Sequence, residues 1–302
     1  MPGCADCCGG EIERRLADAA RAVERAMVRY MPPAHGPAGR LGEAVAYSLA
    51  GGKRLRPMLV RLGAETFGLD PDRVTPTACA FELLHVATLI HDDLPALDNS
   101  ELRRGRPSCH AAFGQATALL AGDALIVAAF SALADQAQEP VTPPGVVMPV
   151  IADFAAAVRD VIAGELADLE GEKQAPDAAL LEFIHSHKTA SLIVAAARAG
   201  ALLAQASDEG LAALTNCSRP LGLLFQLTDD LLDVAGDTAQ TGKPVGADAA
   251  AGKQTYPSVF GVEESRRQAK ELAQQVRVAA ELLPACGDVW AGLADLLLSR
   301  QA

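Results

Sequence analysis

Two acidic segments in this sequence have the residue types and spacing to bind a metal ion. In "LTDDLLDVAGD" at 227–237, Asp229, Asp230 and Asp233 share one side of a helix, because residues three or four apart are neighbours there. Leucines surround these aspartates, which indicates a buried helix, and buried carboxylates need a partner. Since hard cations such as Mg²⁺ prefer oxygen ligands of this kind, the segment predicts magnesium binding.

The other acidic segment, "LIHDDLPALDNS" at 89–100, contains Asp92, Asp93 and Asp98. Pro95 disrupts helical continuation, so Asp98 can rejoin the other two aspartates only if the chain kinks or unwinds after Asp93. Taken alone, this segment is equally compatible with a solvated acidic surface. Two such segments, about 135 residues apart and each closing an apolar helix, instead favour a shared metal site.

Basic residues elsewhere in the chain could bind an anion at that site. Lys53 and Arg56 follow two glycines at the start of an expected helix, where the backbone and the helix N-terminus both accommodate negative charge. His85, two helical turns before Asp92, is either a core histidine or a phosphate contact. Four further cations are each, taken alone, more typical of a surface: Arg103, Arg104, Lys188 and Lys243. Combined with the acidic segments, these residues predict a diphosphate held by magnesium and cationic side chains.

Helices must position these residues, because apolar residues recur at helical spacing along almost the whole chain. Aromatic residues make up only 4% and Ala and Leu dominate, which favours helix over strand. Besides a helix after Gly52, we expect helices at 11–30, 40–50, 73–93, 108–136, 146–172, 208–235, 262–283 and 287–300. We expect loops at 30–40, 139–149 and 236–255, the last a mobile surface loop. The sequence thus predicts an all-α fold, one domain over 1–302 with 1–10 flexible, and long helices around a central space.

Composition argues against several other classes of protein. The net charge of −12 disfavours nucleic acid as a partner. The sequence has no membrane-length apolar run and no secretory signal at its N-terminus. Its 7 scattered cysteines favour a reducing, cytoplasmic location. The cluster of Cys4, Cys7 and Cys8 fits a loose chain end better than a metal site, because no second Cys/His cluster stands nearby.

These motifs together resemble the trans-isoprenyl diphosphate synthase family, the head-to-tail prenyltransferases. The resemblance runs from about Leu49 to Gly261, in the family's order, through "GGKRLRP", "HDDLPALDNSELRRGRP", "AGDAL", "HKT", "FQLTDDLLDVAGD", "GKPVGAD" and "TYPSVFG". It implies an all-α isoprenoid synthase fold with a deep central cavity, normally a homodimer. It also implies isopentenyl diphosphate and allylic diphosphates as substrates, and Mg²⁺ as cofactor, three ions per active site.

The resemblance also implies a role for each matching residue. Magnesium would be bound by Asp92, Asp93, Asp98, Asp229, Asp230 and Asp233. The allylic diphosphate would be contacted by Arg103, Lys188 and Lys243, and isopentenyl diphosphate by Lys53, Arg56, His85 and Arg104. Near the reacting carbons would lie Thr189 and Gln226. In the implied reaction the allylic substrate loses diphosphate, the isopentenyl double bond attacks the resulting cation, and a proton leaves, with the 236–255 loop as a lid.

Two features bear on which member of the family this chain resembles. Glu165 stands where the family often has Gln, with an effect that the sequence does not predict. Ala87 and Thr88, five and four residues before Asp92, occupy the positions where shorter-product members carry an aromatic floor. Their small size predicts a twenty-carbon product, as in bacterial geranylgeranyl diphosphate synthases. Farnesyl diphosphate synthase is the nearest alternative, followed by a terpene cyclase and a silent partner subunit; the intact motifs argue against the last two.

Overall fold

The computed structural model describes residues 5–140, 142, 143, 145–235 and 251–299, and their fold is all-α, as predicted. The only strands in these ranges form one short antiparallel hairpin. The elements up to α6 are α1 (Ala5–Met27), η1 (Val28–Tyr30), α2 (Gly39–Leu49), α3 (Leu55–Thr66), η2 (Pro71–Val74), α4 (Thr75–Asp92), β1 (Leu102–Arg103), β2 (Arg106–Pro107), α5 (Cys109–Phe113) and α6 (Gln115–Gln136). The later elements are α7 (Val147–Gly171), α8 (Ala178–Ile184), η3 (His185–Ala190), α9 (Ser191–Leu203), α10 (Asp208–Ala235), α13 (Tyr256–Phe260), α14 (Val262–Ala280) and α15 (Gly287–Ser299).

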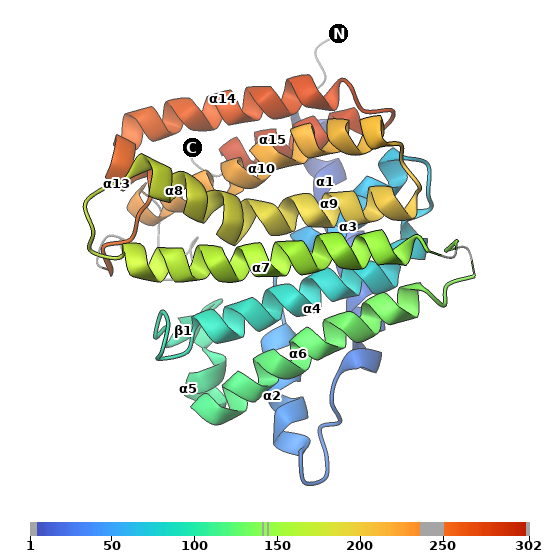
Figure 1. Cartoon of the computed structure of the whole chain (residues 1–302), viewed down its shortest axis with the longest axis vertical. Helices are drawn as coiled ribbons and strands as arrows, with labels where there is room; N and C mark the ends of the chain where they lie inside the picture. The colour runs from blue at the N-terminus through green and yellow to red at the C-terminus, as the bar shows by residue number, and fades with distance from the viewer. Residues whose placement is uncertain (1–4, 141, 144, 236–250, 300–302) are drawn as a thin grey trace.

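The helices lie roughly side by side, with α4 between α6 and α7 in the view of Figure 1. The most extensive contacts join α4 to α6, α3 to α9, and α10 to α14. One continuous hydrophobic core runs through them, and its largest fully buried side chains include Trp290, Phe81 and Phe154. This bundle holds the ends of α4, α7, η3 and α10 in fixed relation, and those ends carry most of the predicted site.

Small residues allow α3 and α9 to pack closely. A Cβ atom on Gly200 of α9 would lie 1.9 Å from the backbone oxygen of Val60, and one on Gly63 of α3 would lie 2.1 Å from that of Ala197. Since real Cβ atoms do not approach other atoms so closely, only glycine fits at these positions. The contact fixes α3, which begins just after Lys53, against the helix that follows Lys188.

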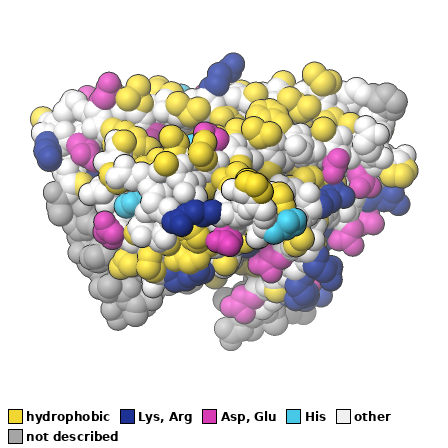
Figure 2. Space-filling model, turned by 90° about the horizontal axis from the view of Figure 1, so that it is seen from below, with side chains coloured by type: hydrophobic (Ala, Val, Ile, Leu, Met, Phe, Trp, Pro, Cys, Tyr) yellow, Lys and Arg dark blue, Asp and Glu magenta, His cyan; other side chains and the backbone are white. Residues whose placement is uncertain are grey.

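Helix α6 is long and apolar enough to cross a membrane by length and composition, and no other described helix is. It packs along α4 over the core instead, as a central helix of a bundle does. Its outer face nevertheless exposes Leu120, Val127 and Phe130. Hydrophobic side chains are spread over much of the surface seen from below in Figure 2.

The observed helix bounds differ from the expected ones at a few points. Helix α1 begins at Ala5, before the expected start at residue 11, and the expected helix at 108–136 is interrupted at Gly114, whose φ of +87° no helix accommodates. The helices at 178–203 were not among the expected ones. The range 236–250, with Lys243 and most of the predicted lid, lies outside the described residues, as does Cys4.

Candidate active site

The chain unwinds at the end of α4, as the position of Asp98 requires. The helix ends at Asp92, and the backbone then turns back so that the Asp98 N–H donates to the Asp92 carbonyl over 2.9 Å. The Ser100 N–H likewise donates to the Asp93 carbonyl over 3.1 Å, and Asn99 adopts a left-handed conformation with φ of +49°. This turn places Asp98 back beside the helix end, which confirms the kink inferred from Pro95.

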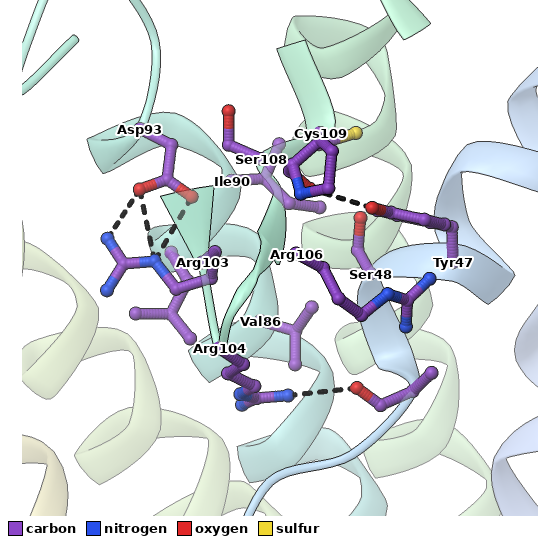
Figure 3. A pocket seen from close by; sticks show the side chains of 13 residues that line it. Tyr47, Ser48, Val86, Ile90, Asp93, Arg103, Arg104, Arg106, Ser108 and Cys109 are labelled. Atoms are coloured by element: carbon purple, nitrogen blue, oxygen red, sulfur yellow. Dashed lines mark hydrogen bonds and ion pairs between the residues drawn. The ribbon is translucent and has the colours of Figure 1, made fainter. Parts of the chain in front are cut away.

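Asp93 holds the hairpin that follows the turn. Its carboxylate is 2% exposed and accepts three hydrogen bonds from the Arg103 guanidinium, at 2.5 to 3.1 Å. Figure 3 shows the two side chains facing each other. The pair is a partly buried, charge-assisted contact of the strong class. In this arrangement Asp93 orients Arg103, and its role in metal binding stays a prediction.

Asp92 lies in a crowded electrostatic environment. Burial raises the pKa of its carboxyl to about 7, with the negative charge of Glu165 as the next largest cause, while Lys188 acts in the opposite direction. The Lys188 ammonium lies 2.7 Å from Glu165 and 2.5 Å from Asp168, and these carboxylates raise the pKa of the lysine. Three carboxylates, those of Asp92, Glu165 and Asp168, therefore lie around the Lys188 ammonium, an arrangement that additional positive charge would stabilise.

Two contributors to this cluster were missed by the sequence analysis. Lys253 donates to Asp98 over 2.8 Å and lies 3.5 Å from Asp168. Asp168, 5% exposed on α7, thus joins Lys188 to Lys253. The signal was present: Lys253 directly precedes "QTYPSVFG", a stretch that overlaps a motif already identified, and Asp168 follows Glu165 by three residues on the same helix face.

The second acidic segment connects to the first through η3. Thr189, next to Lys188, donates to the Gln226 amide oxygen over 2.6 Å, and the Gln226 amide donates to Asp230 over 2.9 Å. The residues of η3 form a π-helical turn, which widens the helix at a point where such turns often mark functional sites. Thr189 and Gln226 are therefore in contact, as expected of two residues near one reaction centre.

Asp230 has protein partners on both carboxylate oxygens. Its carboxylate is 2% exposed, accepts a hydrogen bond from the Tyr256 backbone N–H over 2.9 Å, and lies 3.4 Å from His185 Nε2. The Gln226 amide donates to its other oxygen, so Asp230 ties α10 to η3 and α13. Asp229 and Asp233, on the same helix, are partly exposed. Magnesium binding by these three aspartates stays a prediction.

The predicted isopentenyl diphosphate residues converge on one wall beside α4. Arg56, Arg104 and Arg103 all lie close enough to His85 to lower its pKa, which burial already places well below the usual value. His85 is therefore neutral and can donate one N–H without adding charge. Burial lowers the pKa of Arg56 to about 10, with Glu82 and Asp229 opposing that shift. Arg56 thus links the basic wall to the second acidic segment.

A buried ion pair shapes the loop that carries Lys53. Arg54 has a left-handed φ of +52°, is 2% exposed, and donates to Glu82 over 2.6 Å and to the Leu49 carbonyl over 2.6 Å. A non-glycine residue in this conformation costs on the order of 1 kcal/mol, which the surrounding contacts offset. Lys53 itself is exposed, at the surface end of the same loop.

The two predicted chain-length residues have different surroundings. Thr88 is half-buried and lies about 40° around α4 from Asp92, at 100° per residue, so it faces the same space. Ala87 is fully buried, about 140° from Asp92. It shares its helix face with His91, whose ring packs where a Cβ on Gly122 of α6 would otherwise sit. Ala87 therefore adjoins the contact between α4 and α6.

The donor set of this site suits a hard divalent cation. Among the described residues, no three acidic, histidine or cysteine side chains already surround a metal position. The carboxylates of Asp93 and Asp98 instead pair with Arg103 and Lys253. A magnesium-bound diphosphate requires both members of such pairs. The carboxylates would coordinate the metal, and the cationic side chains would bind phosphate oxygens. The raised pKa of Asp92 likewise indicates a carboxylate placed where a cation would stabilise it.

Comparison with known proteins agrees with this geometry. The profile of the polyprenyl synthetase family matches residues 39–283. The chain is 42% identical over 254 residues to farnesyl diphosphate synthase of Geobacillus stearothermophilus, covering 83% of this chain and 85% of that protein. It is 43% identical over 244 residues to the chloroplastic heterodimeric geranylgeranyl pyrophosphate synthase large subunit 1 of Arabidopsis thaliana, covering 79% and 66%.

Among solved structures, the geranyltransferase from Helicobacter pylori, complexed with magnesium and isoprenyl diphosphate, superimposes with a TM-score of 0.78 at 27% identity. The alignment covers 94% of this chain and 96% of that one. Its helices therefore follow the same course as those that bring the two acidic segments and the basic wall together here. On these grounds the chain belongs to the polyprenyl synthetase family and is a trans-prenyltransferase.

Proposed function

We propose that the enzyme condenses isopentenyl diphosphate with allylic diphosphates, head to tail, and releases geranylgeranyl diphosphate, which has twenty carbons. The reaction takes place in the cytoplasm and uses three magnesium ions per active site. The proposal rests above all on the contacts that run from Asp92 past Lys188 and Thr189 to Gln226 on the second acidic helix. These contacts support one ligand spanning both acidic segments.

The residues of the chain divide the work of this reaction. Magnesium, when bound, would neutralise diphosphate charge and so improve it as a leaving group. Lys188, Lys253 and Arg103 would hold the allylic diphosphate, with Lys243 as a further contact outside the described residues. The basic wall of Lys53, Arg56, His85 and Arg104 would hold isopentenyl diphosphate. Asp92, Asp98, Asp229 and Asp233 would carry the metal, while Asp93 and Asp230 would orient their neighbours.

The oxygens of Thr189 and Gln226 would face the carbon that becomes cationic. Oxygen lone pairs stabilise a developing positive charge and, bonded to each other over 2.6 Å, these two side chains are pre-organised. A proton must then leave the condensation product. The departing diphosphate is the nearest strong base that the chemistry supplies, and it would accept this proton. Exclusion of water by the apolar walls would prevent quenching of the cation to an alcohol.

The distance from Asp92 down α4 to the next aromatic side chain supports a twenty-carbon product. Phe81 lies eleven residues before Asp92, about 16 Å along the helix and within about 20° of the same face. Its ring packs edge-on against Phe154, with centroids 5.1 Å apart, and Phe130 packs on Phe154 at 5.6 Å. An extended isoprene unit is about as long as one helical turn, about 5 Å. The three units of a fifteen-carbon substrate would therefore fill the distance to this aromatic cluster, and a fourth unit would have no room beside it.

Product analysis tests this proposal directly. We expect isopentenyl diphosphate and labelled farnesyl diphosphate to yield geranylgeranyl diphosphate. Ala87→Tyr should stop synthesis at fifteen carbons, because the added aromatic ring would displace Thr88 toward the growing chain. Phe81→Ala should give longer products by opening the aromatic cluster. Release of farnesyl diphosphate as the main wild-type product would instead support the alternative that the Geobacillus relative suggests, a farnesyl diphosphate synthase. No condensation with any allylic starter would contradict both functions.

We also propose that the enzyme is a homodimer that associates through the outer faces of α6 and α7. On α6, Leu120 and Val127 are 57% and 66% exposed, and on α7, Ile162 and Leu166 are 65% and 56% exposed. Leu166 is adjacent in sequence to Glu165, which lies in the active site. Apolar side chains at this density on two neighbouring helices are typical of a surface that another subunit covers.

A further inference from the structure

Arg103 and Arg104, the two arginines predicted to bind the diphosphates, lie on a very short hairpin. Strands β1 and β2 are two residues each and are joined by Arg104 and Gly105, with φ of +55° and +72°. Positive φ at both central residues is the type I′ turn of a two-residue hairpin, which suits Gly105 but strains Arg104. So short a hairpin is not stable alone, and contacts from outside must fix Arg103 and Arg104.

Close packing does not provide all of that support. A pocket lies between the hairpin, the end of α2 and α4. Figure 3 shows Val86 and Ile90 of α4 on one side of it and Ser48 of α2 on another. The hydroxyl of Ser108, which lines the pocket, is buried without a hydrogen-bond partner. Since a hollow provides no dispersion contacts, the position of the hairpin depends on a few discrete anchors.

Three anchors are present, and two of them use the diphosphate-binding arginines themselves. Arg103 bonds to Asp93, and the Arg104 guanidinium donates to the Ala50 and Gly51 carbonyls over 3.3 and 3.0 Å. A ligand that draws on these guanidinium groups competes with both anchors. The third anchor involves neither arginine.

Tyr47, in the last turn of α2, provides the third anchor. Its hydroxyl donates to the Pro107 carbonyl over 2.8 Å, and the Arg106 guanidinium lies over its ring at 4.0 Å from the centroid. Phe113 of α5 packs edge-on against the same ring, with centroids 5.3 Å apart. A cation over an aromatic face, more often arginine than lysine, contributes on the order of 0.5–1 kcal/mol when exposed. The Tyr47 side chain thus contacts strand β2 through the Pro107 backbone carbonyl and the Arg106 side chain.

We propose that Tyr47 is a positioning residue for diphosphate binding. By clamping β2 to α2, it holds the opposite strand and the turn so that Arg103 and Arg104 stay directed at the ligand. The proposal rests on the proposed function for the identity of the substrates, but not for the presence of a diphosphate site. Because the side-chain contacts of Tyr47 are with Pro107, Arg106 and Phe113, away from Thr189 and Gln226, its loss should weaken binding more than it slows the chemical step.

Kinetics of matched variants test this role. For Tyr47→Leu we expect KM for isopentenyl diphosphate to rise about tenfold while kcat stays within about twofold. Tyr47→Phe, which keeps the ring but loses the hydroxyl, should fall between this variant and the wild type. Glu43→Ala is the control, because Glu43 is exposed on the same helix. An unchanged KM in Tyr47→Leu, or an equal rise in Glu43→Ala, would overturn the proposal.

Calorimetric titration with inorganic pyrophosphate and magnesium separates this inference from the proposed function. Weaker binding in Tyr47→Leu supports the clamp even if the wild-type enzyme shows no condensation, whereas unchanged binding contradicts it. If Tyr47→Leu does not fold, Arg106→Lys replaces it: this variant keeps the charge, loses the stacking and alters an exposed residue. A KM in Arg106→Lys equal to that of the wild type would then count against the clamp.

Discussion

At the scale of single residues, the active site is a set of charges in which no member has an ordinary environment. Lys188 lies between carboxylates, His85 lies among arginines, and Asp92 is buried beside Glu165. A ligand that brings magnesium and phosphate together would change the electrostatic environment of each of these side chains. Their protonation therefore couples to binding and to stability.

Magnesium dependence should vary with pH because of Asp92. With its pKa at about 7, this carboxyl is neutral at lower pH and must release a proton before it can coordinate a cation. We expect the half-saturating magnesium concentration to rise about tenfold per pH unit below about pH 7, and to level off above it. Magnesium titrations of activity at pH 6, 7 and 8 measure this. A requirement independent of pH would contradict the assignment of Asp92 as a ligand, and removal of magnesium with a chelator should abolish activity.

The same carboxyl should lower the stability of the protein at alkaline pH. Its folded-state pKa is raised above the unfolded value of 3.8, so its favourable contribution is complete below that value and is lost as the pH rises through about 7. Asp92→Asn should therefore increase the free energy of unfolding at pH 8 by about 1–2 kcal/mol while abolishing condensation. Thermal unfolding without magnesium, at pH 8 and pH 4, provides the measurement; at pH 4 the two proteins should be nearly equal.

Glu165 should influence the pH at which the affinity for magnesium changes. It raises the pKa of Asp92 and lies 2.7 Å from Lys188. Replacement by the neutral isostere, Glu165→Gln, removes that repulsion, so the transition in magnesium affinity should move to lower pH, by about one unit. Glu170→Gln, an exposed position on the same helix, is the matched control and should leave it in place. A transition that moves upward in Glu165→Gln would show that Glu165 acts chiefly on another group.

At the scale of elements, close contacts between helices fix the site. Helix α3 positions Arg56 and, just before its first turn, Lys53. Helix α9 positions Lys188, which lies just before it. The two helices meet at Gly63 and Gly200. Because the obstacle at both glycines is backbone, it cannot rotate away. Displacement of one helix would therefore move both phosphate-binding groups relative to each other.

Gly200→Ala should destabilise the protein by roughly 2–4 kcal/mol, because the added methyl group overlaps the Val60 carbonyl and forces the helices apart. Gly10→Ala, where a Cβ meets nothing within 4 Å, is the control and should slightly stabilise α1 through the higher helix propensity of alanine. Chemical denaturation of both variants compares them. Equal stability of Gly200→Ala and the wild type would contradict the close packing of α3 and α9.

Much of this element-level structure was predictable, for a physical reason. The helix at 208–235 has the expected bounds because its apolar period is unbroken, and the unwinding after Asp93 followed from one proline. Spacing did not distinguish Asp230 from Asp229, although the Asp230 carboxylate accepts a hydrogen bond from the Tyr256 N–H and the Asp229 carboxylate is a neighbour of Arg56. Which helix faces which depends on partners far along the chain, and local periodicity carries no information about them.

At the scale of the whole molecule, the proposed dimer depends on the outer faces of α6 and α7. Val127→Glu and Leu166→Glu place a charge in the proposed interface, so we expect either variant to shift the protein from dimer to monomer. Val278→Glu, at a 53% exposed position on α14, is the control and should leave the dimer intact. Size-exclusion chromatography with light scattering reports the mass. A monomeric wild-type protein would refute the proposed dimer.

The all-α fold follows from the amino-acid sequence, because helical periodicity is a local property. Side-chain type is local too, and the motifs predict carboxylates for magnesium and cations for diphosphate. How these groups pair depends on the folded chain: Asp93 with Arg103, Lys253 with Asp98, Asp230 with Tyr256, and Tyr47 with Arg106. Each of these pairs joins different elements of the fold, so its formation depends on how the helices pack, and packing is a property of the whole chain.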